Sequence, residues 1–508
     1  MTRLLKLCLS SGVTAAFLHF CPAEAWADKA GDTLKVAFTK ELESVDSFFN
    51  SAREGVILQQ SVWDGLVYRD SVTGEYKGNL ATSWKWVDDT TLEFKLREGV
   101  KFHNGEAFDA DDVVYTVNFV ADPKNGVVTQ TNVNWMKEAV KIDGYTVQIK
   151  TKAPFPTALE YLAGPVSMYP NEYYAKVGPA GMALKPVGTG PYAVQSVEPG
   201  KHFVLKKYDG YHDGPKGKAS IGILDIRTIP DANTQLMELL SNGLDLLWGI
   251  PADQAEKLAS MDKFSVVNES TMRVGYLELD AAGRSNPDGP LKKLAVRRAL
   301  NHAIDRKAIV DNLLAGSSKV VNSACFPSQF GCEQDVAVYA YDPKKAKALL
   351  AEAGYKDGLT LDFFAYRDRE LAEALTSYLG QVGIKTNFKY LQYSALHDLR
   401  SKGQTAIAFQ SWGSYSVNDV SAITSLFFKM GELDFARDEE VKNWLQVADT
   451  SIEPATRKEL YGKALKKIAD QAYWVPLFSY NVNYVFTKSV SYKPSPDEVV
   501  RFFQMKWQ

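Results

Sequence analysis

The stretch LREGVKFHNG, residues 96–105, predicts two tight turns with a short strand between them. Each turn contains a glycine, and an Asn-Gly pair favours such a turn because both residues tolerate positive φ. The run before it, Thr91–Leu96, alternates apolar and polar residues as a half-buried strand does. The run after it, Asp109–Phe119, is amphipathic, and Asp111 and Asp112 suit the N-terminus of a helix. The stretch predicts strand, turn, strand, turn and capped helix.

Strand and helix patterns continue to alternate on both sides of this unit. Short alternating or apolar runs predict strands, and apolar residues at helical spacing predict helices. Strands are expected at Thr33–Phe38, Thr146–Lys150, His202–Lys206, Ile223–Ile229, Leu244–Trp248, Leu359–Ala365, Lys385–Tyr390, Ala406–Gln410 and Trp474–Phe478. Helices are expected at Gly55–Trp63, Asn233–Asn242, Leu294–Leu314 (in two pieces, with a cap at Asp305), Lys344–Ala353, Leu371–Val382 and Arg457–Ala472. This alternation predicts α/β lobes with mixed sheets.

Length and composition indicate a globular protein of two or more domains. The chain has 508 residues, of which 45% are hydrophobic and 23% charged. Its net charge of −3 gives no basic footprint, so we expect no nucleic-acid partner. Aromatic residues make up 12% of the chain, which is consistent either with a large core or with an aromatic-lined cleft.

The N-terminus has the three parts of a secretory signal. Basic residues at Arg3 and Lys6 precede the short apolar run Leu7–Phe20, and Ala25-Trp26-Ala27 forms an A-x-A cleavage site. We expect residues 1–27 to be removed after Ala27. No later run approaches the 18 or so apolar residues of a membrane span, so the exported chain should be soluble.

Two of the four cysteines should leave with the signal peptide. Cys21 follows His19 and Phe20, which are too bulky for a lipoprotein signal, so we expect no lipid anchor. The exported chain keeps Cys325 and Cys332, which lie close together in a turn-rich stretch. In an oxidising compartment this spacing predicts a disulfide, with two free thiols as the alternative. A zinc site needs more ligands than this loop offers.

Signatures of catalysis and of cofactor binding are sparse. The chain has no GxxxxGK[ST] loop, no G-x-S-x-G turn and no H-E-x-x-H pair. Gly188-Thr189-Gly190 is followed by Pro191 and opens no helix, so it predicts a turn. We expect no cofactor, no metal and no enzymatic activity. A catalytic site assembled from distant residues, as in a secreted hydrolase, stays the alternative.

Several blocks, in order, give the sequence a specific resemblance. They are GNLA (residues 78–81) with SW (83–84), LREGVKFHNG (96–105), ADDV (110–113), PVGTGPY (186–192), VRRAL (296–300) with AIDR (303–306), and residues 346–354 before a strand. Together they resemble the family 5 extracellular solute-binding proteins, which include periplasmic peptide and nickel binders of ABC importers. The resemblance covers essentially all of the chain after the signal.

The resemblance implies an α/β fold of two lobes, the type II periplasmic binding protein fold (cluster C-like), with an extra subdomain and a hinge. The first lobe would span residues 28–270, with the subdomain at about 64–184. The second lobe would span 271–479, and residues 480–508 would return to the first. The ligand would lie between the lobes.

The same resemblance points to ligand-binding residues in the second lobe. Peptide binders of this family hold the ligand carboxylate with an Arg just after a strand, and Arg367 matches that position. A guanidinium suits a carboxylate because it donates two parallel hydrogen bonds and stays charged. The alternative is a surface Arg paired with Asp368 or Glu370.

The expected amine anchor is missing from the pattern. Family peptide binders carry an Asp in the loop after a W-x-x segment, whereas this chain has Tyr415 there, three residues after Trp412. Asp419 either substitutes for that Asp or caps the helix that follows. Trp412 and Tyr415 either stack on the ligand or belong to the core. Glu41, after the first strand, either contacts the ligand or belongs to a solvated acidic loop.

The resemblance implies a periplasmic solute-binding protein that delivers a ligand to an ABC permease in the inner membrane and works as a monomer. A peptide or peptide-like ligand is expected, and Tyr415 favours a blocked or modified peptide over a free dipeptide. A non-peptide solute, such as an opine, an oligosaccharide or a metal chelate, is the alternative.

Overall fold

The computed structural model describes residues 31–508 except 43, 51 and 315, so the predicted signal peptide with Cys8 and Cys21 lies outside the described residues. Within the described residues, the largest sheet has ten strands in the order β14-β13-β15-β12-β16-β11-β1-β10-β9-β8. Their bounds are β1 Thr33–Phe38, β8 Tyr192–Glu198, β9 His202–Lys207, β10 Ile223–Thr228, β11 Leu246–Trp248, β12 Phe264–Leu279, β13 Leu359–Ala365, β14 Ile384–Tyr390, β15 Ile407–Trp412 and β16 Trp474–Thr487. The sheet mixes parallel and antiparallel pairs, as the sequence predicted.

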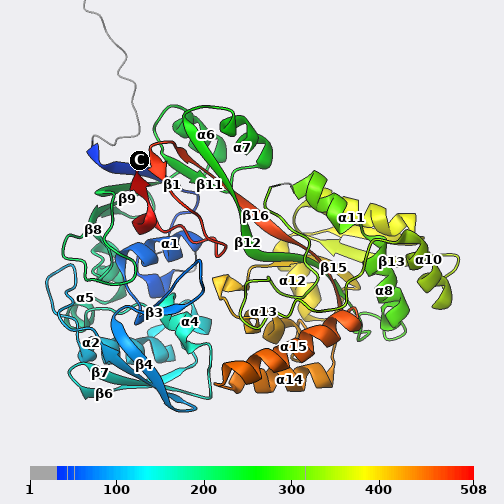
Figure 1. The fold of residues 1–508 in the computed structure, drawn as a ribbon, viewed down its shortest axis with the longest axis horizontal. Coiled ribbons are helices and arrows are strands. Elements are labelled where there is room, and N and C mark those ends of the chain that lie inside the picture. Colours follow the sequence, from blue (N-terminus) through cyan, green and yellow to red (C-terminus); the bar gives the residue numbers. More distant parts are fainter. Residues whose placement is uncertain (1–30, 43, 51, 315) are drawn as a thin grey trace, which may run out of the picture.

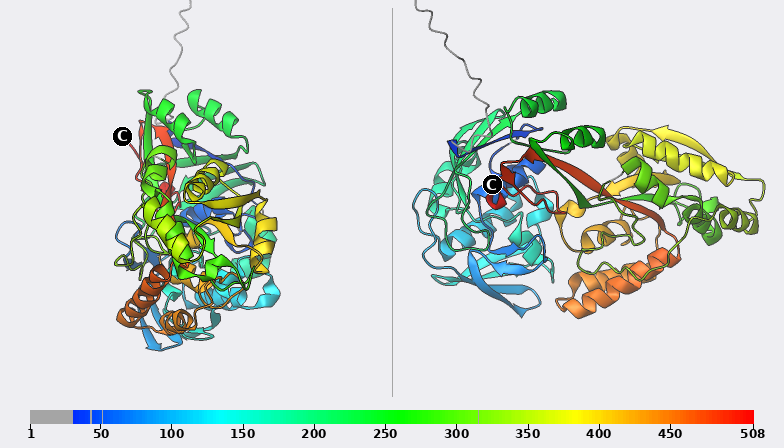
Figure 2. Two further views of the ribbon diagram at one scale, coloured as in Figure 1. Left: turned by 90° about the vertical axis from the view of Figure 1, so that its right-hand side faces the viewer. Right: turned by 45° about the horizontal axis from the view of Figure 1, so that its top comes forward.

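Two long strands carry the chain between two lobes. β12 and β16 pair antiparallel from Phe264↔Thr487 to Glu278↔Trp474, with a register shift between Ser270 and Val274. Figure 1 shows them running diagonally from the first lobe, on the left, to the second lobe, on the right, and the right-hand view of Figure 2 shows the same crossing. This shift and a second one, between Gly275 and Tyr276, interrupt the ladder along the middle of the two strands.

A four-stranded antiparallel sheet lies at the far end of the first lobe (Figure 1). Its order is β4-β5-β7-β6, with β4 Ala81–Asp88, β5 Thr91–Leu96, β6 Met136–Asp143 and β7 Thr146–Thr151, and helix α2, Ala110–Ala121, packs on β6 and β7. Gly99 and Gly105 have φ of 76° and 92°, as the predicted turns require. The predicted cap needs correction: Asp109 is the N-cap, and of the two predicted residues only Asp112 takes part, by completing a capping box.

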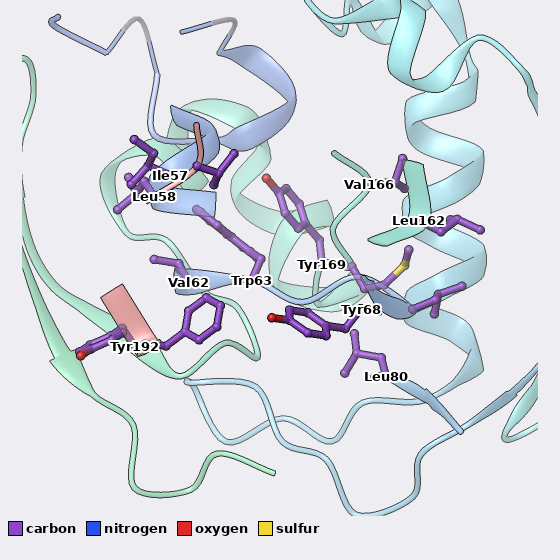
Figure 3. Packing of buried hydrophobic residues seen from close by; sticks show 14 of the residues in the cluster. Ile57, Leu58, Val62, Trp63, Tyr68, Leu80, Leu162, Val166, Tyr169 and Tyr192 are labelled. Carbon is purple, nitrogen blue, oxygen red and sulfur yellow. The ribbon is translucent and has the colours of Figure 1, made fainter. Parts of the chain in front are cut away.

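The core of the first lobe brings distant segments together. Figure 3 shows Trp63 and Tyr169 packed among aliphatic side chains. The Trp63 indole donates to the carbonyl of Val187 at 3.0 Å. A Cβ at Gly188 would lie 2.1 Å from the carbonyl oxygen of Val62, and one at Gly190 would lie 2.5 Å from that of Ser61. The predicted turn at Gly188-Thr189-Gly190 therefore needs glycine because α1 crosses it closely.

The remaining elements of the first lobe surround this core. They are α1 Arg53–Val62, α3 Gln130–Val133, α4 Ala158–Ala163, α5 Asn171–Leu184, α6 Ala232–Leu240, α7 Ala252–Ala259, β2 Val67–Arg69 and β3 Tyr76–Gly78. The C-terminal stretch returns to this lobe, since Phe502 and Met505 belong to its core and the Trp507 indole donates to Asp32 at 2.8 Å.

The second lobe has two large hydrophobic clusters, on either side of the strands that it contributes to the large sheet, and a small one around Phe364, Leu396 and Ala408. Its helices are α8 Leu294–Ala303, α9 Arg306–Ile309, α10 Pro343–Glu352, α11 Arg369–Gln381, α12 Tyr393–Ser401, α13 Ser421–Phe427, α14 Glu439–Thr450 and α15 Pro454–Asp470. The break predicted at Asp305 is confirmed, because its carboxylate accepts from the N–H of Ala308. Lobe boundaries at residues 270 and 479 stay predictions, since β12 and β16 each contribute to the cores of both lobes. Among the described residues, no helix is both long enough and apolar enough to cross a membrane.

Candidate ligand-binding site

A cavity of about 440 Å³ lies where the two lobes and the C-terminal stretch meet. Its size falls in the range of small-molecule sites. The first lobe supplies most of the wall, through α1, α3 and α4 with their neighbouring loops, and the second lobe supplies Ser416 and Val417. The described residues that line it are Ser47, Asn50, Arg53, Val56, Gln59, Gln60, Tyr68, Arg69, Thr129, Asn132, Glu160, Ala163, Gly164, Pro165, Ser416, Val417, Asp497, Val499 and Arg501.

Arg53, in the first turn of α1, connects the three parts of the wall. Its Nη1 donates to Ser416 Oγ at 2.6 Å and to the carbonyl of Asp497 at 3.0 Å. Ser416 Oγ donates in turn to the same carbonyl at 2.7 Å. Arg53 Nη2 lies 3.0 Å from Glu498 Oε2, and Arg273 of β12 approaches the other oxygen of Glu498 at 3.8 Å. First lobe, second lobe and C-terminal stretch are therefore joined at one edge of the cavity.

A second charged group lies at the same junction. Arg69 is 3.1 Å from Glu160 and 3.5 Å from Asp497, and Arg501 donates to Asp497 at 2.9 Å. Burial alone would raise the pKa of Asp497, but Arg501 and Arg69 outweigh it and hold that pKa well below its usual range. The N–H of Asn418, in the second lobe, donates to Glu160 at 3.0 Å. This second bond crosses between the lobes.

A disulfide-closed loop supports the second-lobe wall from behind. Cys325 and Cys332 are joined by a disulfide in this structure. Within the loop, Gln329 Nε2 donates to the carbonyl of Val417 at 3.1 Å, and the N–H of Phe330 donates to the carbonyl of Asn418 at 3.0 Å. The backbone that faces the cavity is therefore hydrogen-bonded to the disulfide loop.

Comparison with known proteins places the chain in a family. A family model described as bacterial extracellular solute-binding proteins, family 5 Middle, matches residues 75–433. The chain belongs to this family.

Relatives of this family 5 protein match it along most of their length. Heme-binding protein A of Haemophilus influenzae is 26% identical over 455 residues, covering 82% of this chain and 81% of the relative. The glutathione-binding protein GsiB of Escherichia coli is 26% identical over 486 residues, covering 92% and 91%. Among solved structures, HbpA2 from Haemophilus parasuis has a TM-score of 0.83 at 24% identity, covering 94% of this chain and 100% of that one. DppA from Helicobacter pylori, in complex with the peptide STSA, has a TM-score of 0.73 at 24% identity, covering 94% and 98%.

The position predicted for the carboxylate anchor, Arg367, lies on the second lobe after β13. Its Nε donates to Asp368 at 2.7 Å, its Nη1 donates to Ser411 at 2.7 Å, and its guanidinium lies 4.6 Å from the ring centre of Tyr480. The pairing with Asp368 is one of the alternatives that the sequence left open. The side chain is 29% exposed, and Arg367 is not among the described residues that line the cavity.

The loop after Trp412 reaches the cavity only in part. The Trp412 indole donates to the carbonyl of Ala422 at 2.8 Å and packs edge-on against Phe427. The backbone of Tyr415 lies in the 3-10 turn Ser414–Ser416, but its side chain lies outside the described part of the structure. Its role therefore stays a prediction.

Asp419 is held within the second lobe. It is 4% exposed, lies 2.9 Å from Arg457, and accepts from the N–H of Ser421, the first residue of α13. Burial raises the pKa of Asp419, and Arg457 opposes that effect. Glu41 is exposed, and its carboxylate lies against the turn at Gly200. Neither is among the described lining residues of the cavity.

The lining residues Arg53, Gln60, Glu160 and Asp497 were missed by sequence reasoning. They come from α1, α4 and the C-terminal stretch, and they carry no motif. The described residues also contain no group of three or more His, Cys, Asp and Glu side chains placed to hold a metal ion.

Proposed function

We propose that this family 5 solute-binding protein is the periplasmic component of an ABC importer and captures a peptide or peptide-like solute in the cavity between its lobes. The observation that carries this proposal is the cavity wall itself. Residues from both lobes and from the C-terminal stretch line one space of about 440 Å³. A solute bound there would contact all three parts at once and would favour the closed arrangement.

Access to the cavity would depend on the hinge. Arg53–Ser416 and Glu160–Asn418 join the lobes beside the cavity, so parting the lobes would break both hydrogen bonds. The register shift on β12 gives a place where the two crossing strands can bend. A permease would then distinguish the closed from the open form by the relative position of the lobes.

The peptide assignment is supported by relatives that bind peptide-like solutes. GsiB of Escherichia coli is named for binding glutathione, and DppA from Helicobacter pylori was solved with a peptide. The alternative is a non-peptide solute, favoured by the name of heme-binding protein A of Haemophilus influenzae. Solved proteins with this fold also include NikA from Brucella suis with Fe(III)-EDTA and AgaA with agropinic acid.

The site residues inferred from the sequence enter the proposal as ligand contacts on the second lobe. Arg367 would bind an anionic group of the solute inside the closed cleft, and Tyr415 would replace the Asp that binds the ligand's amino group in other members. Export to the periplasm would follow removal of residues 1–27. We further propose that the protein acts as a monomer and without catalysis.

A thermal shift assay tests the proposal. The protein is melted with pools of peptides and, in separate wells, with glutathione, haem or an opine. A solute that binds only the folded state stabilises it by about 2.7 kcal/mol when its concentration is 100 times Kd. The melting temperature of the protein then rises. We expect reversible shifts with peptide-like solutes and full recovery of unchanged solute. A shift with haem or the opine alone would favour the alternative, and consumption of the solute would indicate an enzyme.

A further inference from the structure

Gln60 occupies an unusual position in the cavity wall. It lies on the same face of α1 as Arg53 and Val56, because residues spaced by three, four or seven share a face of a helix. The residue as a whole is only 9% exposed. Its backbone carbonyl accepts from Lys216 Nζ at 2.7 Å, but within the described part of the chain its side-chain amide has no hydrogen-bond partner.

Other amides of the wall are occupied. Asn50 Nδ2 donates to the carbonyl of Ser44 at 2.7 Å, and Gln59 Nε2 donates to the carbonyl of Pro165 at 2.9 Å. Asn132, in α3, resembles Gln60, since no hydrogen bond of its side chain occurs among the described residues. Asn132 is partly exposed, and neither amide is among the fully buried, unpartnered polar groups of the described residues. Both amides therefore face the cavity without a protein partner and are available to a ligand that enters it.

The charged groups of the wall are mutually compensated. Arg53 pairs with Glu498, Arg69 with Glu160, and Arg501 with Asp497. A carboxylate or ammonium group buried beside them would have to break an existing pair or remain unpaired, and both are costly. An uncharged amide needs no counter-ion, and it matches the two donors and one acceptor atom of a glutamine side chain.

On these grounds we propose that Gln60 is a specificity-determining residue, which together with Asn132 selects an uncharged amide group of the solute over a carboxylate or an ammonium. This inference rests on the proposed function and names the chemistry of the solute segment that enters the cavity. Arg367 lies outside the cavity wall, so an anionic group bound there and an amide bound at Gln60 would belong to different parts of one solute.

Calorimetry with tripeptides tests the inference. The probes are trialanine peptides in which Gln, Glu, Lys or Met replaces alanine at each position in turn. The proteins are wild type, Gln60→Leu, Gln60→Glu and, as a matched control, Gln381→Leu at an exposed glutamine of α11. At one position, wild type should bind the Gln peptide about 10-fold or more tightly than the Glu and Lys peptides. Gln60→Leu should shift that preference toward Met, Gln60→Glu should shift it toward Lys, and Gln381→Leu should match wild type.

The possible outcomes distinguish a failure of the Gln60 inference from a failure of the proposed function. Peptide binding with equal affinity for Gln and Glu, or a preference that survives Gln60→Leu in a folded variant, overturns the inference and leaves the proposed function standing. Failure of every tripeptide to bind overturns both for peptide solutes. Melting curves of each variant establish that it is folded.

Discussion

Ser416 Oγ and Arg53 Nη1 lie 2.6 Å apart, and this hydrogen bond joins the 3-10 turn of the second lobe to helix α1 of the first. It lies at the cavity edge, and both partners also contact the carbonyl of Asp497. In the proposed function, this bond would form only when the lobes meet and would therefore stabilise the closed form over the open one.

Removing this bond should favour the open form. Arg53 is 31% exposed, so solvent screens its ion pair and the loss should be about 1 kcal/mol, below the usual range for hydrogen bonds to charged groups. Arg53→Ala should therefore weaken solute binding about 5-fold and raise the radius of gyration measured by small-angle scattering without solute. Lys201→Ala, at an exposed ion pair of the first lobe, serves as the control. An Arg53→Ala protein that scatters and binds as wild type does would show that the bond is incidental.

Reduction of the disulfide should affect both stability and binding. Closing so short a loop contributes about 2–3 kcal/mol in the chain-entropy model. Gln329 and Phe330 in this loop hold the backbone of Val417 and Asn418, so the double variant Cys325→Ser/Cys332→Ser should also bind solute more weakly. Calorimetry at a temperature where the variant is folded checks this. Two free thiols in unreduced, denatured protein would contradict the disulfide, and unchanged affinity would limit its role to stability.

Arg367→Ala should weaken binding of an anionic solute by roughly 2–5 kcal/mol, about 30-fold or more, while the fold survives. Its contacts with Asp368 and Ser411 fix the guanidinium at the end of β13. Amidation of the solute carboxylate should cost wild type as much as the substitution does. If amidation and Arg367→Ala both leave the affinity unchanged, Arg367 only forms the ion pair with Asp368.

Tyr415→Asp should shift the preference of the protein toward solutes with a free ammonium group, because the substitution introduces a carboxylate at that position.

Asp46, beside the cavity residue Ser47, should make stability depend on pH. Burial raises the pKa of Asp46 from 3.8 to about 6, against the opposing effect of hydrogen bonds from Tyr174 and Tyr169. The native state therefore binds more protons than the unfolded state between these values, and its stability falls as pH rises through this window. The whole shift corresponds to about 3 kcal/mol.

The comparison of wild type with Asp46→Asn isolates this effect. His103, whose pKa burial lowers to about 4, contributes in the opposite direction over much of the same window. Urea unfolding at pH 4 and pH 7 should show the variant gaining about 2–3 kcal/mol on wild type as pH rises. A difference that stays constant between the two pH values would contradict the assignment.

Local patterns of the sequence predicted many of the helices and strands, but others, such as α5, α7, α12, β4, β6 and β8, were not predicted. Turns at Gly99 and Gly105 and the cap at Asp305 depend on a few neighbouring residues, so their chemistry is visible in the chain. β12 was not predicted, because Asn268, Glu269 and Ser270 interrupt its apolar pattern where it crosses between the lobes.

The cavity could not be predicted in the same way. Asn418 and Glu160 lie 258 residues apart, and nothing near either residue indicates the other. Gln60 lies in an amphipathic helix, and nothing in the pattern of that helix distinguishes it from any other polar residue. Only the tertiary structure shows that it faces the cavity. Asp419 lies four residues after the position at which the family carries its Asp, and its ion pair with Arg457 depends on how α15 packs. Sites assembled from distant segments need the tertiary structure.

A crystal structure of the protein with the solute that it retains through purification would show directly where the solute binds. We expect a chemically intact, peptide-like solute in the cavity between the lobes, with an uncharged amide bonded to Gln60 and with Arg53 still bonded to Ser416. A solute bound on the outside of one lobe, or a cleaved product in the cavity, would contradict this expectation.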